Sequence, residues 1–416
     1  MRPPSEVDVA IIGAGAAGIA AGRRLAEAKV NFVVLEARSR IGGRARTVNA
    51  GGFPLDVGCG WLHSADRNPW VKIAEAEGLK VDRTEPPWGK PALEHGFSAE
   101  EQREFRSAMQ AFYRRLDEAG DAHRDRPLAD FLEPGGKWNS LLNAISTYVN
   151  GVELDRASVC DSAAYSDSEV NWRVVEGYGT AIAKSGEKLP IVLECKVRSV
   201  DHSGKKLRIE TAQGVLTARA AIITIPTQLI ADEAFRFAPE LAEKLDAARG
   251  LPLGLADKTY LSLDDAERFP KESRLFGKVH SLGAANYHIR PFGRPVIEVY
   301  FGGKLARKLD EAGEGAFGAF AIDELANLVG SDIRPKLKTL AESHWARDPF
   351  ARGSYSYALP GHADARRKLA APVDGRLFFA GEACSPGNFT TAHGAYESGV
   401  TAAEQTIATL KRKRTS

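Results

Sequence analysis

Three glycines near the start of the chain have the spacing of a phosphate-binding turn. Gly13, Gly15 and Gly18 follow an apolar run at 8–12 that is typical of a buried parallel strand. A helical pattern of apolar residues begins within the glycine run. Such a turn lets the backbone approach a pyrophosphate, which then faces the free N–H groups of the helix N-terminus. The spacing predicts a dinucleotide site. A glycine-rich turn in an ordinary α/β protein is the alternative.

An acidic residue and a second glycine pair indicate which dinucleotide is bound. Glu36 ends the apolar run 32–35, close to the roughly 20 residues after the last glycine at which a ribose-binding acid is expected. The pair Gly42-Gly43 stands among Arg38, Arg40 and Arg44, where guanidinium groups could hold further phosphate oxygens. This second phosphate clamp favours FAD over NAD, and a solvated basic loop is the alternative. The cofactor contacts predicted in this part of the chain are Gly13, Gly15, Ala16, Ala17, Gly18, Glu36, Ala37, Arg38, Gly42, Gly43 and Arg44.

The C-terminal part of the chain supports the same cofactor. A short apolar run at 376–380 leads into Gly381 and Glu382, and a helix rich in small residues begins near Thr391 and Ala392. The carboxylate of Glu382 could accept hydrogen bonds from ribityl hydroxyls. The helix N-terminus could face the edge of the flavin where negative charge develops on reduction. The alternative is a closely packed helix pair beside an exposed Glu382.

Composition predicts a two-domain protein of the α/β class. The chain has 416 residues, a net charge of +2, 44% hydrophobic residues and 26% charged residues, so no nucleic-acid or membrane partner is expected. Its four cysteines lack metal or disulfide spacing, which favours a cytoplasmic location and no metal site. We predict a discontinuous, Rossmann-like FAD-binding domain (1–78, 175–250 and 352–416). The predicted substrate domain (79–174 and 251–351) is α+β, with a mixed sheet and flanking helices.

A capping box within the predicted substrate domain marks the start of a helix. Ser98 and Glu101 have the required spacing, and the helix carries several large apolar side chains. These side chains are Phe105, Met109, Phe112, Tyr113 and Leu116. We interpret them as core packing rather than as ligand contacts.

Several further motifs occur in the order found in one family. They are the glycine turn 13–18, Leu35–Arg38, Arg40–Arg44, Asp56–Gly58, Lys258, Trp345–Tyr357 and Phe379–Glu382. With these motifs the chain resembles the flavin-containing monoamine oxidase superfamily, which includes polyamine oxidases and flavin-dependent histone lysine demethylases. Most relevant here are the polyamine oxidase and demethylase versions of the segment from Trp345 to Tyr357.

The resemblance implies roles for particular residues. Lys258 would hold a water against flavin N5 and assist the reaction with oxygen, although an exposed lysine is the simpler interpretation of its position. Trp345 would pack near the flavin ring and Tyr355 would form a wall of the substrate pocket, so these two and Lys258 are the predicted catalytic residues. Further cofactor contacts implied in this way are Gly60, Trp61 and the backbone of Val197.

Two departures from the membrane-bound monoamine oxidases qualify the resemblance. Gly353 and Ser354 stand where those enzymes have a flavin-linked cysteine, so the FAD is expected to be non-covalent. Thr391 stands where they have a second cage tyrosine, which argues against a paired aromatic cage. The candidate substrate contacts are His63, Thr391 and Tyr355, and no arginine is assigned to a substrate carboxylate.

The activity implied by the resemblance is FAD-dependent amine oxidation of a bacterial type. Hydride from the carbon next to the amine passes to flavin N5, and the imine is hydrolysed. O2 then reoxidises the reduced flavin, which releases hydrogen peroxide. Three alternatives stay open: a C–C desaturase with another electron acceptor, an L-amino-acid oxidase, and a non-enzymatic flavin-binding protein. A homodimer is consistent with the resemblance.

Overall fold

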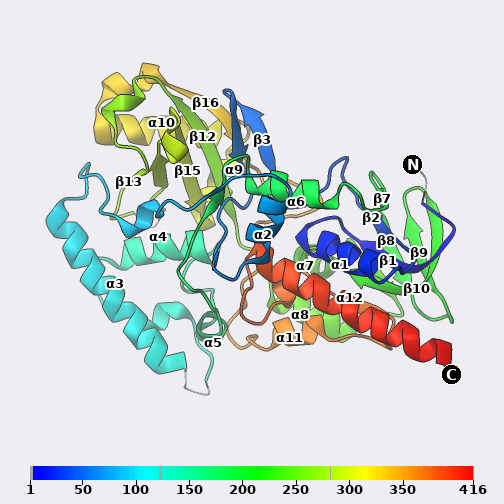
Figure 1. The fold of residues 1–416 in the computed structure, drawn as a ribbon. Coiled ribbons are helices and arrows are strands. Elements are labelled where there is room, and N and C mark those ends of the chain that lie inside the picture. Colours follow the sequence, from blue (N-terminus) through cyan, green and yellow to red (C-terminus); the bar gives the residue numbers. More distant parts are fainter. Residues whose placement is uncertain (1–2, 121–123, 282, 416) are drawn as a thin grey trace.

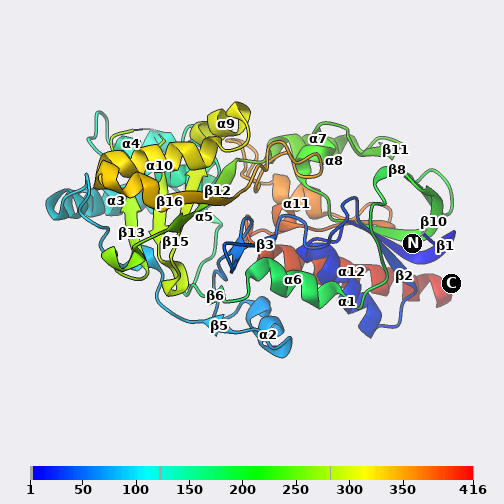
Figure 2. The same ribbon diagram turned by 90° about the horizontal axis from the view of Figure 1, so that it is seen from above.

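Two β-sheets, each covered by its own helices, form the two ends of the molecule (Figures 1 and 2). The structure is a computed structural model that describes residues 3–120, 124–281 and 283–415. The first sheet lies at the end that carries both termini, and the second lies at the opposite end (Figure 1). The class is α/β, as the sequence predicts.

The first sheet contains the strand that precedes the glycine turn. Its order is β11-β8-β9-β10-β1-β2-β7, and β17 pairs with the second half of β10. The central strands β10, β1 and β2 are parallel, as a crossover helix between β1 and β2 requires. The strands are β1 (Glu6–Ile12), β2 (Phe32–Leu35), β7 (Ile191–Val192), β8 (Val197–Asp201), β9 (Leu207–Thr211), β10 (Gly214–Ile223), β11 (Arg236–Ala238) and β17 (Leu377–Phe379).

Helices cover both faces of this sheet because its central strands are apolar on both sides. On one face Val9 and Ile11 of β1 pack with α1 (Ala16–Glu27) and α12 (Ala392–Thr415). On the other face Ala10 and Ile12 belong to the core formed with α8 (Ala242–Gly250) and α11 (Ala365–Ala370). Helices α1 and α12 lie side by side across the sheet (Figure 1). The glycine turn is thus held between two packed layers.

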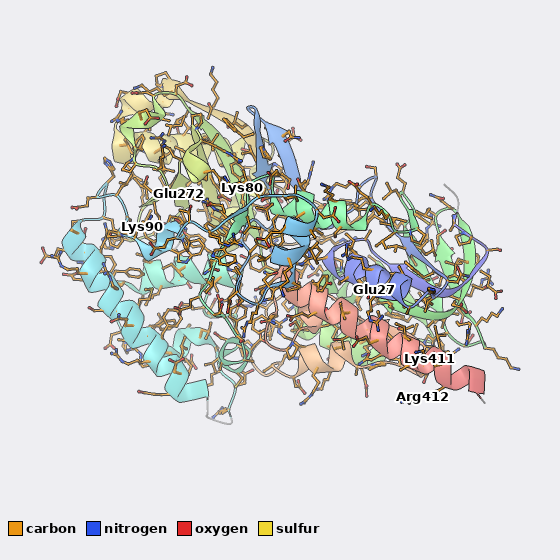
Figure 3. The ribbon with its side chains drawn as sticks, viewed as in Figure 1. Glu27, Lys80, Lys90, Glu272, Lys411 and Arg412 are labelled. Atoms are coloured by element: carbon orange, nitrogen blue, oxygen red, sulfur yellow. The ribbon has the colours of Figure 1, made fainter. Side chains whose placement is uncertain are left out.

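The second sheet is antiparallel and has the order β13-β14-β15-β12-β16. One face is covered by α9 (Gly303–Ala312) and α10 (Ala316–Val329), whose apolar side chains share a core with the strands. The strands are β12 (Ala256–Leu263), β13 (Ser273–Phe276), β14 (Asn286–Ile289), β15 (Val296–Gly302) and β16 (Leu337–Glu342). Figure 3 shows Glu272 beside these strands, far from Arg412 near the end of α12.

A helical segment lies against the other side of the second sheet. Helix α3 begins one residue after Ser98, whose backbone N–H donates to Glu101 Oε2 (2.9 Å) while its Oγ accepts from Glu101 N (3.3 Å), so the predicted capping box is confirmed. Side chains of this segment share a core with Phe276 of β13. Its helices are α3 (Ala99–Gly120), α4 (Asn139–Val149) and α5 (Val159–Ala163).

Short elements connect these larger parts. They are β3 (Thr47–Ala50), β4 (Phe53–Asp56), α2 (Pro69–Ala76), β5 (Val81–Asp82), β6 (Arg173–Val174), α6 (Tyr178–Gly186) and α7 (Thr227–Ala231). None of the helices within the described ranges is long and apolar enough to cross a lipid bilayer.

Two local features bear on the site. Strands β7 and β8 are separate, and Glu194 between them has a positive φ of 55°. Lys258 lies inside β12. The proposed domain boundaries stay a prediction. Their support is that the strands of the first sheet all lie within 1–78, 175–250 and 352–416, and those of the second sheet within 251–351.

Candidate active site

A cavity of about 1020 Å³ runs from the glycine turn, past the second sheet, to helix α3. This volume is at the upper end of the roughly 300–1,000 Å³ usual for small-molecule sites. It is therefore large enough to hold more than one small ligand. Every residue predicted from the sequence to touch cofactor or substrate lines it, except Gly18 and Arg40.

The glycine turn leaves the N-terminus of α1 open toward the cavity. Gly15 is the N-cap and no side chain caps the helix, so its first N–H groups are available to a ligand. A Cβ at Gly43 would lie 3.1 Å from the Cα of Gly15, so the two loops approach at backbone distance. A Cβ at Gly18 would lie 1.9 Å from Gly13 O, so a glycine at 18 allows the helix to pack closely against the turn. These features fit a pyrophosphate at the helix N-terminus.

Glu36 lines the cavity just after the end of β2, and hydrogen bonds to the backbone hold its side chain in place. It is 3% exposed, and its carboxylate accepts from the backbone N–H groups of Ala14 (2.8 Å) and Arg38 (2.9 Å). The guanidinium of Arg38 donates to Asp348 at 2.7 Å. Thus Arg38 reaches the cavity as an ion pair, and Arg40 is not among the lining residues. Arg38 and Arg44 line the cavity, and a phosphate clamp formed by their guanidinium groups stays a prediction.

Glu382 is buried between two arginines, so the interpretation as an exposed residue is wrong. It accepts from Arg44 Nη1 (2.9 Å), Ser356 Oγ (2.7 Å) and Thr390 N (3.1 Å). Burial raises the pKa of Glu382, but Arg44 and Arg366 outweigh burial, and the net pKa lies below its usual value. This carboxylate therefore stays ionised and fixes Arg44 at the cavity wall.

The N-terminus of α12 points at the same cavity. Thr391 Oγ1 accepts from Gly394 N (3.0 Å) and donates to Asn388 O (2.6 Å), so this hydroxyl caps the helix. Ala392 lies at the first turn, and its carbonyl accepts from Trp70 Nε1 at 3.0 Å. Thr391 and Ala392 line the cavity, and contact of this helix N-terminus with the flavin stays a prediction. A substrate contact by Thr391 stays a prediction.

Lys258 is buried in the cavity wall, so the interpretation as an exposed lysine is wrong. It is 2% exposed, and its Nζ lies 2.7 Å from Glu298 Oε1 and 3.1 Å from the carbonyl oxygen of Asp56. The ring of Tyr300 lies 4.9 Å from the same nitrogen. Burial lowers the pKa of Lys258, but the opposing effects of Glu298 and Tyr300 are larger together, and the net pKa lies above its usual value. Lys258 is therefore a fixed positive charge.

A chain of buried charges begins at Lys258 in the cavity wall and ends beyond it. Glu298 lies 3.6 Å from His288, and His288 lies 2.7 Å from Glu272. Glu272 in turn lies 2.8 Å from Arg173. Burial lowers the pKa of His288, but the two neighbouring carboxylates raise it by more, so the net pKa lies above its usual value. The charges alternate in sign, which lets the protein bury them together.

Aromatic side chains form the wall beside Lys258. Trp345 Nε1 donates to Val57 O at 3.2 Å, and the Trp345 backbone is held by Asp257. Tyr355 donates its hydroxyl proton to the carbonyl oxygen of Tyr148. These bonds fix both predicted catalytic aromatics at the cavity surface.

The remaining predicted contacts lie at separate parts of the cavity. His63 Nδ1 lies 2.6 Å from Asn171 Oδ1, and burial lowers the pKa of His63, so its ring is neutral. Trp61 meets the ring of Trp88 edge to face at 4.5 Å. The lining residues also include Ala16, Ala17, Ala37, Gly42, Gly60, Val197 and Gly381.

Helix α3 contributes more than core packing. All five of its large side chains line the cavity, although Phe105, Phe112 and Leu116 also belong to the helical core. Core packing is confirmed for Phe105, Phe112 and Leu116, and these side chains also line the cavity. Tyr300, Tyr148, Glu298 and Arg274 are lining residues that sequence reasoning missed. They lie on strands and a helix of ordinary composition, and no local pattern distinguishes them.

Comparison with known proteins identifies the class to which this fold and site belong. The sequence profile of the flavin-containing amine oxidoreductases matches residues 16–157 and 161–407. The chain belongs to this family, and its cofactor is FAD.

Individual relatives agree with this assignment. The chain is 29% identical to polyamine oxidase 2 of Arabidopsis thaliana, over 97% of this chain and 88% of that protein. It is 25% identical to human lysine-specific histone demethylase 2, over 96% of this chain and 53% of that protein. In fold it is similar to wild-type putrescine oxidase bound to putrescine, with a TM-score of 0.81 and 19% identity over 98% of this chain and 100% of that one.

Proposed function

We propose that this protein oxidises an amine at the carbon next to nitrogen and uses O2 as the final electron acceptor. When bound, FAD accepts a hydride from that carbon and passes both electrons to O2, which yields hydrogen peroxide. For a primary amine the net reaction consumes the amine, O2 and water and gives an aldehyde, ammonia and hydrogen peroxide. The observation that carries the proposal is the buried Lys258 ammonium on the wall of a cavity that begins at a dinucleotide turn.

Lys258 supplies a positive charge where oxygen would be reduced. Glu298 and the Asp56 carbonyl hold its Nζ in place, so this charge needs no rearrangement during the reaction. Preorganised charge of this kind stabilises negative charge that develops in a dry site. We therefore assign Lys258 to the oxygen reaction rather than to amine binding.

The aromatic wall and the neutral His63 favour binding of the unprotonated amine. Trp345 and Tyr355 present ring surface to the cavity, and burial keeps His63 uncharged. Substrate positioning is the main contribution expected from the protein, because the hydride is transferred directly to the cofactor.

The FAD is expected to be held without a covalent bond to this chain. Gly353 and Ser354 offer no thiol. Cys59 does line the cavity, but burial raises its pKa to about 12, so it stays a protonated, weakly nucleophilic thiol. Acid precipitation should therefore release all of the flavin into the supernatant.

Stopped-flow kinetics on the FAD-loaded protein test the role of Lys258. Lys258→Met should leave anaerobic reduction by an amine nearly unchanged but slow reoxidation by O2 at least about tenfold, a loss of about 1.4 kcal/mol of transition-state stabilisation. Lys338→Met, an exposed lysine of the same sheet, is the matched control. Equal reoxidation rates in wild type and Lys258→Met would show that the assignment is wrong.

We also propose a cytoplasmic location. All four cysteines are unpaired thiols, which is usual in a reducing compartment. Cell fractionation of the source organism should place the amine-dependent peroxide production with cytoplasmic markers, and recovery with extracellular or membrane markers would contradict this.

A further inference from the structure

One half-buried arginine on the cavity wall has no anionic partner. Arg274 lies on β13, and its guanidinium packs against the ring of Phe276 at 3.9 Å. Its Nε is buried without a hydrogen-bond partner, and within the described ranges neither a hydrogen bond nor an ion pair reaches the rest of the guanidinium. Burial lowers the pKa of Arg274 to about 10, which still leaves it charged at neutral pH.

The three arginines that are fully buried in the described part of the chain are all paired. Each contacts a carboxylate: Arg173 contacts Glu272, Arg290 contacts Glu267, and Arg366 contacts Asp161. Buried charges in proteins are normally paired because the unpaired ion loses its hydration without compensation. Arg274 lines the cavity with its Nε buried and unpartnered, so a ligand could supply the missing anion.

Two more unsatisfied polar atoms lie in the same wall. The hydroxyl of Tyr148 and Oδ1 of Asn286 are both buried without a partner. Tyr148 is near enough to Arg274 for each to affect the other's pKa. A carboxylate here could accept from the guanidinium and from the Tyr148 hydroxyl, which are the donors that such a group needs.

The sheet register places this site at a distance from Lys258. Lys258 pairs with Tyr300, Tyr300 with Asn286, and Asn286 with Phe276, so these side chains share one face, and Arg274 is on that face two residues before Phe276. Strands β12 and β13 are three positions apart, which separates their backbones by roughly 14 Å. Tyr300 and Tyr148 bridge the interval, with ring centroids 6.5 Å apart.

From this arrangement we propose that the substrate is an amine with a carboxylate several carbons away from the nitrogen, bound by Arg274 and Tyr148. The proposal rests on the proposed amine oxidation and specifies its substrate class. An α-amino acid does not fit, because its amine and carboxylate share one carbon. A diamine or polyamine does not fit either, because its second ammonium would meet the Arg274 charge in a poorly hydrated wall.

The acidic residues of the cavity do not reverse this preference. Asp117, Asp167 and Glu169 line it but are exposed, and Asp167 already accepts from Ser64 Oγ at 2.9 Å. Exposed carboxylates attract a cation only weakly because water screens them. Glu298 is occupied by Lys258. Arg274 is thus the charge that selects the distant end of the substrate.

A series of six-carbon compounds tests the proposal on the FAD-loaded protein. The compounds are 6-aminohexanoate, hexylamine, 1,6-diaminohexane and norleucine, compared by anaerobic flavin reduction. Wild type should prefer 6-aminohexanoate. Arg274→Gln should lower the preference for 6-aminohexanoate over hexylamine by about 30-fold or more, as loss of a buried charge partner predicts. Arg268→Gln, an arginine of the same domain outside the cavity, should keep the preference. A wild-type preference for any of the other three compounds would overturn the proposal.

Binding of hexanoate separates failure of this proposal from failure of the proposed function. Hexanoate has the carboxylate but no amine, and its binding is followed by calorimetry and by the change in flavin absorbance. If no amine reduces the flavin, amine oxidation is wrong, yet hexanoate binding that weakens about 30-fold in Arg274→Gln would still support the carboxylate site. Equal hexanoate affinity in wild type and Arg274→Gln, or no binding to either, would overturn it. Arg274→Met gives a second variant, because removing an unpaired charge should not impair folding.

Discussion

Replacing Glu298 by glutamine should destabilise the protein strongly, because it leaves the Lys258 ammonium buried without its counter-ion. The side chains of this pair are 3% and 11% exposed. After the change, Nζ loses its charged partner and keeps neutral ones, such as the Asp56 carbonyl at 3.1 Å and the face of Tyr300 at 4.9 Å. Breaking a buried pair by removing one partner costs about 3–5 kcal/mol. We therefore expect Glu298→Gln to lower the free energy of unfolding by about that amount.

Urea unfolding followed by tryptophan fluorescence measures this change, at one fixed excess of FAD because bound cofactor adds to apparent stability. Glu404→Gln is the control: its partner Arg24 lies 3.4 Å away, and the side chains are 58% and 33% exposed. That exposed pair should contribute less than about 1 kcal/mol. The double variant Glu298→Leu with Lys258→Met removes both charges and should recover much of the lost stability. The reasoning is refuted if Glu298→Gln is no less stable than Glu404→Gln.

Three further predictions concern pH, cofactor binding and helix capping. Since the pKa of His288 is raised in the folded protein, the stabilising contribution of His288 is complete below about pH 6.5 and is lost as pH rises through the raised value. Urea unfolding across this pH range should show the loss of stability in wild type and not in His288→Gln. Parallel stability profiles of the two proteins would contradict the prediction. Gly18→Ala places a Cβ 1.9 Å from Gly13 O and should weaken FAD binding about tenfold or more by calorimetry, whereas unchanged affinity would disprove the close packing. Ser98→Ala removes the cap of α3 and should cost about 1 kcal/mol in urea unfolding, clearly more than Ser107→Ala inside the same helix; equal losses would count against the cap.

The parts of the site that sequence reasoning found are those encoded by neighbouring residues. The glycine turn, Glu36 at the end of β2 and the start of α12 are each specified within a few positions of the chain. Glycine spacing and helix caps are local signals, because they depend on the backbone conformation of the residues that carry them. The family resemblance added Lys258, whose burial and cavity-facing position the structure now shows.

What the sequence did not reveal depends on contacts between distant segments. Glu298 faces Lys258 only because β15 pairs with β12 in one register, and Arg274 reaches the same wall two strands further on. A slip of one residue would turn either side chain to the opposite face. Helix α3 was assigned to the core because its apolar pattern does not distinguish side chains that meet protein from those that meet a cavity.

The central claim is that FAD lies along the glycine turn and takes electrons from an amine held beside Lys258. The most direct test is to mix the FAD-loaded protein with amines without oxygen, record the visible flavin spectrum, and then admit air. We predict loss of the oxidised-flavin absorbance with one carbonyl product formed per flavin, and its return on aeration with one hydrogen peroxide per flavin. Folded protein that binds no FAD, or whose bound flavin stays oxidised with every amine, would contradict the claim.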